Sequence, residues 1–188
     1  KRFGNIFLSS FILIPCNSIS LLTKTKGYPA RNPNGYCVLL CPGGGYAVLS
    51  MGHEGRDMKD WFNARGFTFA LLQYRMPRGH YDVPLSDVQQ SMRILHSRED
   101  LGIKNVGVMG FSAGGHLAST AATHYVDEAT RPDFQILVYP VITMERPYTH
   151  EGSRFGLLGA EPSEELVQLY CNHKQVTSDT PAAFILAA

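Results

Sequence analysis

Short runs of apolar residues that alternate with helix-like segments are the feature that most constrains the fold of this chain. The runs lie at residues 36–41, 67–74, 106–109, 134–139 and 182–186. They are apolar throughout rather than alternately polar, which is typical of strands buried on both faces. Strands and helices that take turns form right-handed crossovers. The sequence therefore predicts an α/β fold with a mostly parallel sheet and helices on both faces.

The segments between the runs have the spacing of helices that bury one side. Helices are predicted at residues 53–65, from residue 84 onward, at 112–123 and from residue 162 onward. In the second of these, Leu85, Val88, Met92 and Leu95 recur at intervals of three and four residues. Such a stripe indicates a helix that packs against the sheet.

Length and charge limit the function classes. The chain has 188 residues, 44% of them hydrophobic and 18% charged, which is the balance of a folded globular domain. The 17 basic and 16 acidic side chains leave a net charge of +1, and no basic block stands out. Nucleic-acid binding therefore has no electrostatic support. A small or weakly charged substrate fits this composition better.

Residues 1–22 have the features of a secretory leader. Lys1 and Arg2 precede an apolar stretch at residues 6–14, and small residues follow it. The stretch is too short to span a bilayer. The pattern favours export to the periplasm or the exterior. The alternative is a cytoplasmic protein in which this stretch forms an early edge strand.

The rest of the chain divides at residue 36. Residues 23–35 are polar and rich in turn formers, and we expect them to be a linker. Residues 36–188 then form one domain. The four cysteines, at positions 16, 37, 41 and 171, match no zinc pattern, and Cys37 and Cys41 are expected to be buried. We expect no metal and no cofactor.

Gly110-Phe111-Ser112-Ala113-Gly114 directly follows a predicted strand and opens a predicted helix. This is the context of a nucleophile elbow, in which a serine sits on a sharp, strained turn. Gly110 and Gly114 would relieve the crowding where the backbones cross. The helix N-terminus favours the negative charge that develops in acyl transfer. Ser112 is therefore the candidate nucleophile.

A glycine run ends the first predicted parallel strand, in Cys41-Pro-Gly-Gly-Gly-Tyr46. A serine nucleophile needs backbone N–H donors for the oxyanion, and glycines let a main chain turn its amides into a pocket. Gly43 and Gly44, together with Ala113 after the nucleophile, are the expected donors. A phosphate-binding loop is the alternative, but no lysine follows the glycines.

These motifs belong to a longer set that resembles a known family. The set comprises Cys41–Tyr46, His53–Gly55, Gln73–Pro77, Val83–Asp87, Gly107–Ser119 and Arg131–Phe134. Over about residues 34 to 188, the chain resembles bacterial α/β-hydrolases of the acetylxylan and related carbohydrate esterase type, often found with xylan-degrading enzymes. Dienelactone hydrolases and hormone-sensitive-lipase-like esterases share this fold. The resemblance implies a Ser-Asp-His triad, an oxyanion hole and hydrolysis of small-molecule or oligosaccharide esters.

The chain departs from the family at its end. The resemblance implies an acid just after the last predicted strand and a histidine further on, and these 188 residues contain neither position. His116 is four residues after Ser112 on the same helix and cannot act as its base. His53, His80 and His150 are surface residues or line the cleft. We therefore expect a truncated chain, inactive or nearly so by itself, with an exposed apolar sheet edge.

Two other functions remain open at this stage. Prolyl-oligopeptidase-type peptidases share the fold and the chemistry, although no repeat in this sequence predicts their propeller domain. A catalytically incomplete hydrolase fold that serves as a binding module is the third possibility. The intact elbow argues against it. The acyl group, the substrate and the oligomeric state are not predicted by the sequence.

Overall fold

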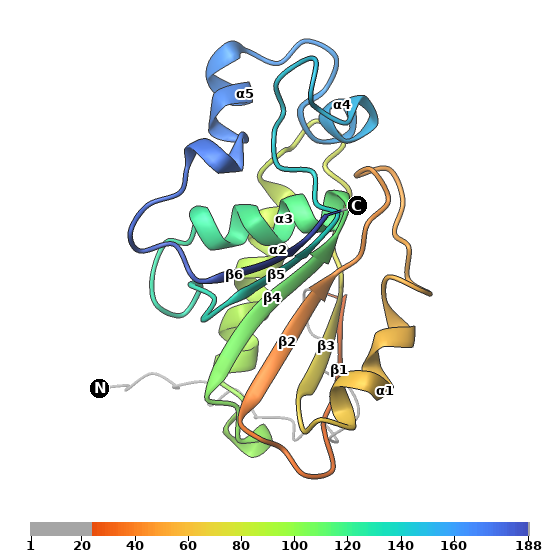
Figure 1. Ribbon diagram of the computed structural model, residues 1–188, viewed down its shortest axis with the longest axis vertical. Coiled ribbons are helices and arrows are strands. Elements are labelled where there is room, and N and C mark those ends of the chain that lie inside the picture. Colours follow the sequence, from red (N-terminus) through yellow and green to blue (C-terminus); the bar gives the residue numbers. More distant parts are fainter. Residues whose placement is uncertain (1–23, 188) are drawn as a thin grey trace, which may run out of the picture.

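The computed structural model describes residues 24–187, and the predicted leader lies outside the described residues. Its centre is a six-stranded sheet in the order β1-β3-β2-β4-β5-β6 (Figure 1). The strands are β1 (Lys24–Tyr28), β2 (Tyr36–Cys41), β3 (Thr68–Gln73), β4 (Asn105–Phe111), β5 (Gln135–Val138) and β6 (Ala183–Leu186). All neighbours are parallel except β1 and β3. The predicted mostly parallel sheet is confirmed.

Strand β1 lies where the sequence predicted a linker, so that prediction is wrong for residues 24–28. The segment alternates exposed lysines with buried Thr25 and Gly27. It pairs antiparallel with β3, and the Thr25 hydroxyl lies 2.8 Å from that of Ser91. Lysines are common on edge strands because they discourage pairing with other chains. The polar composition therefore belongs to a sheet edge.

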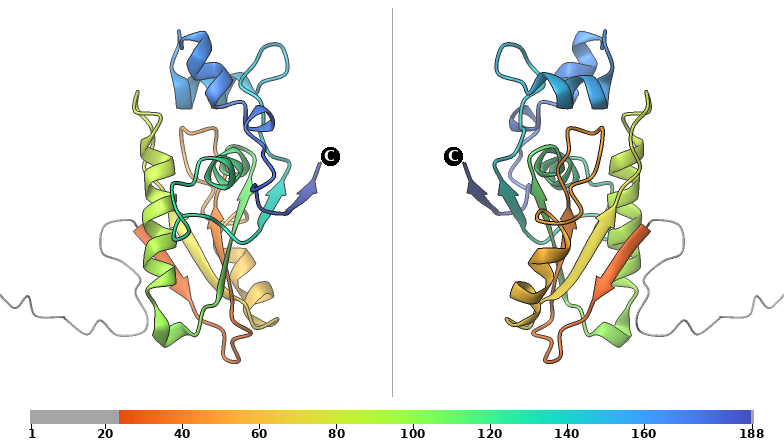
Figure 2. Two further views of the ribbon diagram at one scale, coloured as in Figure 1. Left: turned by 90° about the vertical axis from the view of Figure 1, so that its left-hand side faces the viewer. Right: turned by 90° about the vertical axis from the view of Figure 1, so that its right-hand side faces the viewer.

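The α-helices among residues 24–187 are α1 (Lys59–Asn63), α2 (Val83–His96), α3 (Ala113–Thr123), α4 (Glu151–Leu158) and α5 (Glu164–Leu169). Helices α2 and α3 cover one face of the sheet and α1 lies on the other (Figure 2). Helices α4 and α5 lie beyond the carboxyl ends of the strands (Figure 1). The helix predicted over residues 53–65 is shorter than expected, because residues 51–55 form turns before a 3₁₀ turn at Arg56–Met58. Helix α4 was not predicted.

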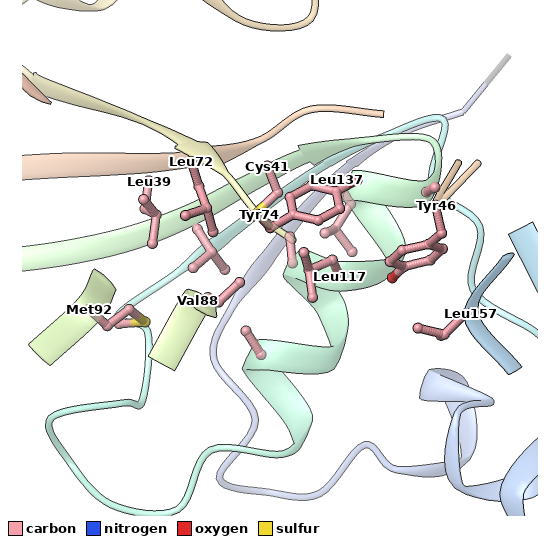
Figure 3. Packing of buried hydrophobic residues seen from close by; sticks show 14 of the residues in the cluster. Leu39, Cys41, Tyr46, Leu72, Tyr74, Val88, Met92, Leu117, Leu137 and Leu157 are labelled. Carbon is pink, nitrogen blue, oxygen red and sulfur yellow. The ribbon is translucent and has the colours of Figure 1, made fainter. Parts of the chain in front are cut away.

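Two apolar clusters lie on opposite faces of the sheet. In β2, Leu39 belongs to the cluster under α2 and α3, whereas Val38 and Leu40 belong to the cluster beside α1. Figure 3 shows the first cluster, in which Leu39 and Leu72 lie near Val88 and Met92 of α2. Alternate side chains of a strand point to opposite faces, so a strand between two clusters must be apolar throughout.

The α1 face of the sheet is only partly covered. An apolar hollow of about 690 Å³ lies there between α1 and β6. All four residues of β6 are exposed, and Phe184 keeps 64% of its surface accessible. The expected apolar edge is therefore present. None of the helices within residues 24–187 is long and apolar enough to cross a bilayer.

Candidate active site

Ser112 lies in the turn between β4 and α3 and has a positive φ of 51°. Its amide donates to the Val138 carbonyl at 3.1 Å, and its own carbonyl accepts from the amides of Val141 and His116 at 3.1 and 3.0 Å. A non-glycine residue at positive φ is strained by about 1–3 kcal/mol and persists only where its surroundings hold it. The hydrogen bonds on both sides supply that constraint.

The two elbow glycines are required by close backbone approaches. A Cβ on Gly110 would overlap the carbonyl oxygen of Gly114, and a Cβ on Gly114 would overlap the carbonyl oxygen of Cys41. These contacts are with main chain rather than with flexible side-chain ends, so they cannot be relieved by a rotamer change. In this backbone arrangement both positions therefore accept only glycine.

The glycine run lies beside the elbow because of the sheet register. Strands β2 and β4 are parallel neighbours, and Cys41 at the end of β2 pairs with Gly110. The carbonyl of Gly44 accepts from the amides of Ala47 and Val48, both at 3.1 Å, which closes the turn. Gly44 has a φ of 130°, a conformation that side chains disfavour.

Gly43 differs from its expected role. Its amide donates to Oε2 of Glu54 at 2.9 Å. Because the one N–H of Gly43 already donates to Glu54, this amide is not available to an oxyanion in this structure. Within residues 24–187, the amides of Gly44 and Ala113 donate no hydrogen bond to a protein acceptor. They are the two expected donors that the structure leaves available.

Glu54 and Tyr139 are the site residues that sequence reasoning missed. The Tyr139 hydroxyl donates to Oε1 of Glu54 at 2.8 Å. Loss of hydration at this position and the hydrogen bond to the carboxylate raise the pKa of Tyr139 to about 12. Glu54 stands in the His53–Gly55 motif, so the resemblance marked its position but gave it no role. No pattern in the sequence marked Tyr139.

His116 is a buried packing residue, as predicted. Its Nδ1 lies 2.8 Å from the Tyr46 hydroxyl, and its Nε2 lies 2.9 Å from the carbonyl oxygen of Tyr170. Because a carbonyl can only accept, Nε2 carries the proton and the Tyr46 hydroxyl donates to Nδ1. Burial lowers the pKa of His116 to about 4, although its hydrogen bond to Tyr170 acts in the opposite direction.

The other candidate histidines are exposed or bond to groups other than Ser112. The His53 imidazole is 97% exposed and 3.6 Å from Asp57. His150 caps α4 by accepting from the Ser153 amide at 3.1 Å, and His80 is exposed. Among the described residues, no histidine hydrogen-bonds to Ser112.

The cysteines within the described residues are buried free thiols, and burial raises the pKa of Cys37 to about 12. A thiol of this kind is protonated and inert at neutral pH. Within residues 24–187, no three His, Cys, Asp or Glu side chains gather as metal ligands would.

A family model of the α/β-hydrolase fold matches residues 38–188. An acetylxylan esterase from Xylanibacter ruminicola is 40% identical over 84% of this chain, which spans 34% of that protein. An endo-1,4-β-xylanase from Butyrivibrio fibrisolvens is 37% identical over 79% of this chain, which spans 26% of it. The chain thus covers about a third or less of these two relatives.

Solved structures show the same architecture. An acetyl ester-xyloside bifunctional hydrolase from Caldicellulosiruptor lactoaceticus superposes with a TM-score of 0.79 at 34% identity, over 88% of this chain and 65% of that one. A sugar hydrolase from Lactococcus lactis superposes with a TM-score of 0.71 at 27% identity, over 89% and 67% of the two chains. On its strand order, its strained serine turn and these matches, the chain belongs to the α/β-hydrolase family.

Proposed function

We propose that the protein is a serine esterase that removes acetyl or similar acyl groups from the sugars of plant polysaccharides. The observation that carries this proposal is the strained Ser112 at the start of α3, beside the glycine run; within residues 24–187 the amides of Gly44 and of the adjacent Ala113 donate to no protein acceptor. The 40% identity to an acetylxylan esterase and the structural match to an acetyl ester-xyloside hydrolase support this substrate class.

In the proposed reaction, Oγ of Ser112 attacks the acyl carbonyl carbon and loses its proton to a base. The bond between the carbonyl carbon and the sugar oxygen breaks, and the sugar leaves as an alcohol after taking up a proton. Water then hydrolyses the acyl-enzyme and releases the acid. The amides of Gly44 and Ala113 would stabilise the oxyanion, and the N-terminus of α3 adds a favourable field.

The base is proposed to come from outside residues 24–187. A serine hydroxyl is a weak nucleophile without a neighbouring base. Both ring nitrogens of His116 are engaged in the core, and no described histidine hydrogen-bonds to Ser112. We therefore infer that these 188 residues alone turn over ester slowly or not at all. Export of the protein stays a prediction.

That no described histidine hydrogen-bonds to Ser112 favours a second candidate, a hydrolase fold that binds an oligosaccharide or small-molecule ester without cleaving it. The strained serine turn distinguishes the two. A binding module has no use for positive φ at Ser112, whereas a nucleophile needs it to expose the hydroxyl. We therefore favour the esterase.

The test is steady-state hydrolysis by the full-length protein, with p-nitrophenyl acetate, acetylated xylo-oligosaccharides and proline amides as substrates. We expect the parent protein to release acetate, and Ser112→Ala to have a kcat lower by roughly 10³-fold or more. Ser97→Ala, at an exposed position, is the matched control and should keep full activity. Binding of the oligosaccharide without serine-dependent hydrolysis would favour the module, and cleavage of the amides would favour a peptidase.

A second measurement addresses the base. The 188-residue chain and its Ser112→Ala variant are treated with a fluorophosphonate and read by intact mass. We expect no rapid labelling of the folded chain. Rapid single labelling that disappears in the variant would mean that a base within these residues activates the serine, against our inference.

A further inference from the structure

Glu54 joins two loops that lie at the carboxyl ends of different strands. Its Oε2 accepts from the amide of Gly43, in the loop after β2, at 2.9 Å. Its Oε1 accepts from the hydroxyl of Tyr139, just after β5, at 2.8 Å. Each carboxylate oxygen thus serves a different loop. Hydrogen bonds to an ionised acceptor are about twice as strong as neutral ones, so the link is a firm one.

The link lies next to the nucleophile. A Cβ on Gly43 would overlap Oε2 of Glu54 and would lie 3.2 Å from the Cβ of Ser112. The Tyr139 ring packs on Phe111, the residue before the nucleophile, with ring centroids 5.6 Å apart. The carboxylate of Glu54 and the serine therefore border the same glycine.

Glu54 has the wrong charge and contacts to stabilise an oxyanion itself. A carboxylate repels negative charge, and in this structure it takes up the amide of Gly43. What it can do is hold the Pro42–Gly43 peptide, one unit before the amide of Gly44, in one orientation. Gly43 is buried, and its carbonyl accepts from the Ser50 amide at 3.0 Å, so Glu54 supplies the partner on its other side. Gly44, the next residue, has a free amide within the described chain.

Tyr139 completes the arrangement. Its φ of 36° is uncommon for a non-glycine residue, and its amide donates to Leu186 of β6 at 2.6 Å. Because the pKa of its hydroxyl is raised to about 12, Tyr139 stays protonated across the physiological range and can donate to Glu54 throughout it. The donor is therefore permanent rather than pH-switched.

We propose that Glu54 is a positioning residue for the oxyanion hole. By anchoring the Gly43 amide to Tyr139 it fixes the Pro42–Gly43 peptide, and together with the Ser50 amide on the Gly43 carbonyl this sets the direction of the Gly44 amide. This inference rests on the proposed esterase function. The amide of Gly44 stabilises charge only if it points at the oxyanion when that charge forms, and preorganised donors are worth the most in the transition state. Glu54 therefore acts on the chemical step rather than on substrate binding.

The test compares Glu54→Ala, Glu54→Gln and Tyr139→Phe in the full-length protein with p-nitrophenyl acetate. We expect Glu54→Ala to lower kcat by roughly 10- to 100-fold with KM within about 3-fold, because one oxyanion donor is worth about 10²–10³ in kcat. Glu54→Gln should stay within about 5-fold of the parent, since its amide oxygen accepts from Gly43 and its NH₂ donates to the tyrosine oxygen. The kcat of Tyr139→Phe should lie between the values of the two Glu54 variants.

Two further measurements separate positioning from a general structural role. Affinity for a trifluoromethyl ketone, which forms a tetrahedral oxyanion adduct, should fall in parallel with kcat in Glu54→Ala. Circular dichroism and thermal unfolding check that each variant is folded. Glu128→Ala, at an exposed glutamate between α3 and β5, is the matched control and should change none of these quantities.

The inference is overturned if Glu54→Ala keeps kcat within about 3-fold of the parent, or raises KM while kcat is unchanged. It is also overturned if the kcat of folded Glu54→Gln falls as far as that of Glu54→Ala. The negative charge, and not the hydrogen-bond geometry, would then be what matters. These outcomes require a parent whose hydrolysis depends on Ser112. A parent without serine-dependent activity contradicts the proposed function instead.

Discussion

The centre of the sheet and its β6 edge are built from similarly apolar residues but have different surroundings. Strand β4 pairs with β2 and β5, has apolar clusters on both faces, and leaves Val108 fully buried. Strand β6 pairs only with β5, and Phe184 on it is 64% exposed. The strained Ser112 follows β4. A strained residue persists where its neighbours fix it, and at Ser112 they are Val138 at the end of β5, Val141 after it, and His116 of α3.

The largest expected effect is at the elbow. Gly110→Ala places a Cβ into the Gly114 backbone, so we expect a loss of about 4 kcal/mol in the free energy of unfolding, or a displaced serine turn. Urea unfolding measures the loss. Gly52→Ala is the control, because an added Cβ there has no heavy atom within 4 Å. Equal stability of the two variants would show that the crossing at Gly110 is not tightly packed.

The next prediction compares the two regions directly. Leu39→Ala removes a fully buried side chain from β2 and should cost about 3 kcal/mol through lost burial and a cavity. Leu186→Ala, in β6 with 53% of its surface exposed, should change the free energy of unfolding by less than about 0.5 kcal/mol. Denaturant unfolding of both variants measures the contrast. A cost at Leu186 equal to that at Leu39 would mean that β6 is covered in solution.

The smallest effect concerns pH and His116. Its folded pKa of about 4 lies below the ordinary value of 6.5, so the unfolded chain binds the proton more readily. Above about pH 6.5, neutral His116 makes its full contribution to the free energy of unfolding. This contribution is lost as the pH falls toward 4, and the loss is about 2.5 kcal/mol at pH 4.5. The free energies of unfolding of the parent and of His116→Gln, measured at pH 7 and 4.5, isolate the pH-dependent contribution of His116. Equal pH dependence in the two proteins would contradict it.

Patterns within short segments predicted much of the fold. The runs that became β2 to β5 are mostly apolar because each of these strands packs between two apolar clusters. The stripe that became α2 shows its buried side through its spacing. β1 was missed because alternating lysines at a sheet edge have the composition of a linker, and whether such a segment pairs depends on the neighbour that β3 offers.

The site residues divide in the same way, into those that a short segment predicts and those that only the fold brings together. Ser112 and its two glycines were predicted because the elbow is one continuous segment with strict steric demands. The bond from the Gly43 amide to Glu54 was not predicted, because Glu54 is 11 residues away and reaches Gly43 across a turn. Tyr139 could not be found from the sequence, because its link to Glu54 spans 85 residues and depends on the strand order.

Sequence patterns thus predicted the α/β architecture, the candidate nucleophile and the glycine loop, since each follows from local sterics and the pattern of burial along one segment. Only the three-dimensional arrangement shows that Glu54 takes up the Gly43 amide, that His116 is a core residue, and that Tyr139 reaches the same carboxylate. Those facts depend on which groups fill the few hydrogen-bonding positions around the turn. Distant segments compete for these positions, and only the packed sheet brings them together.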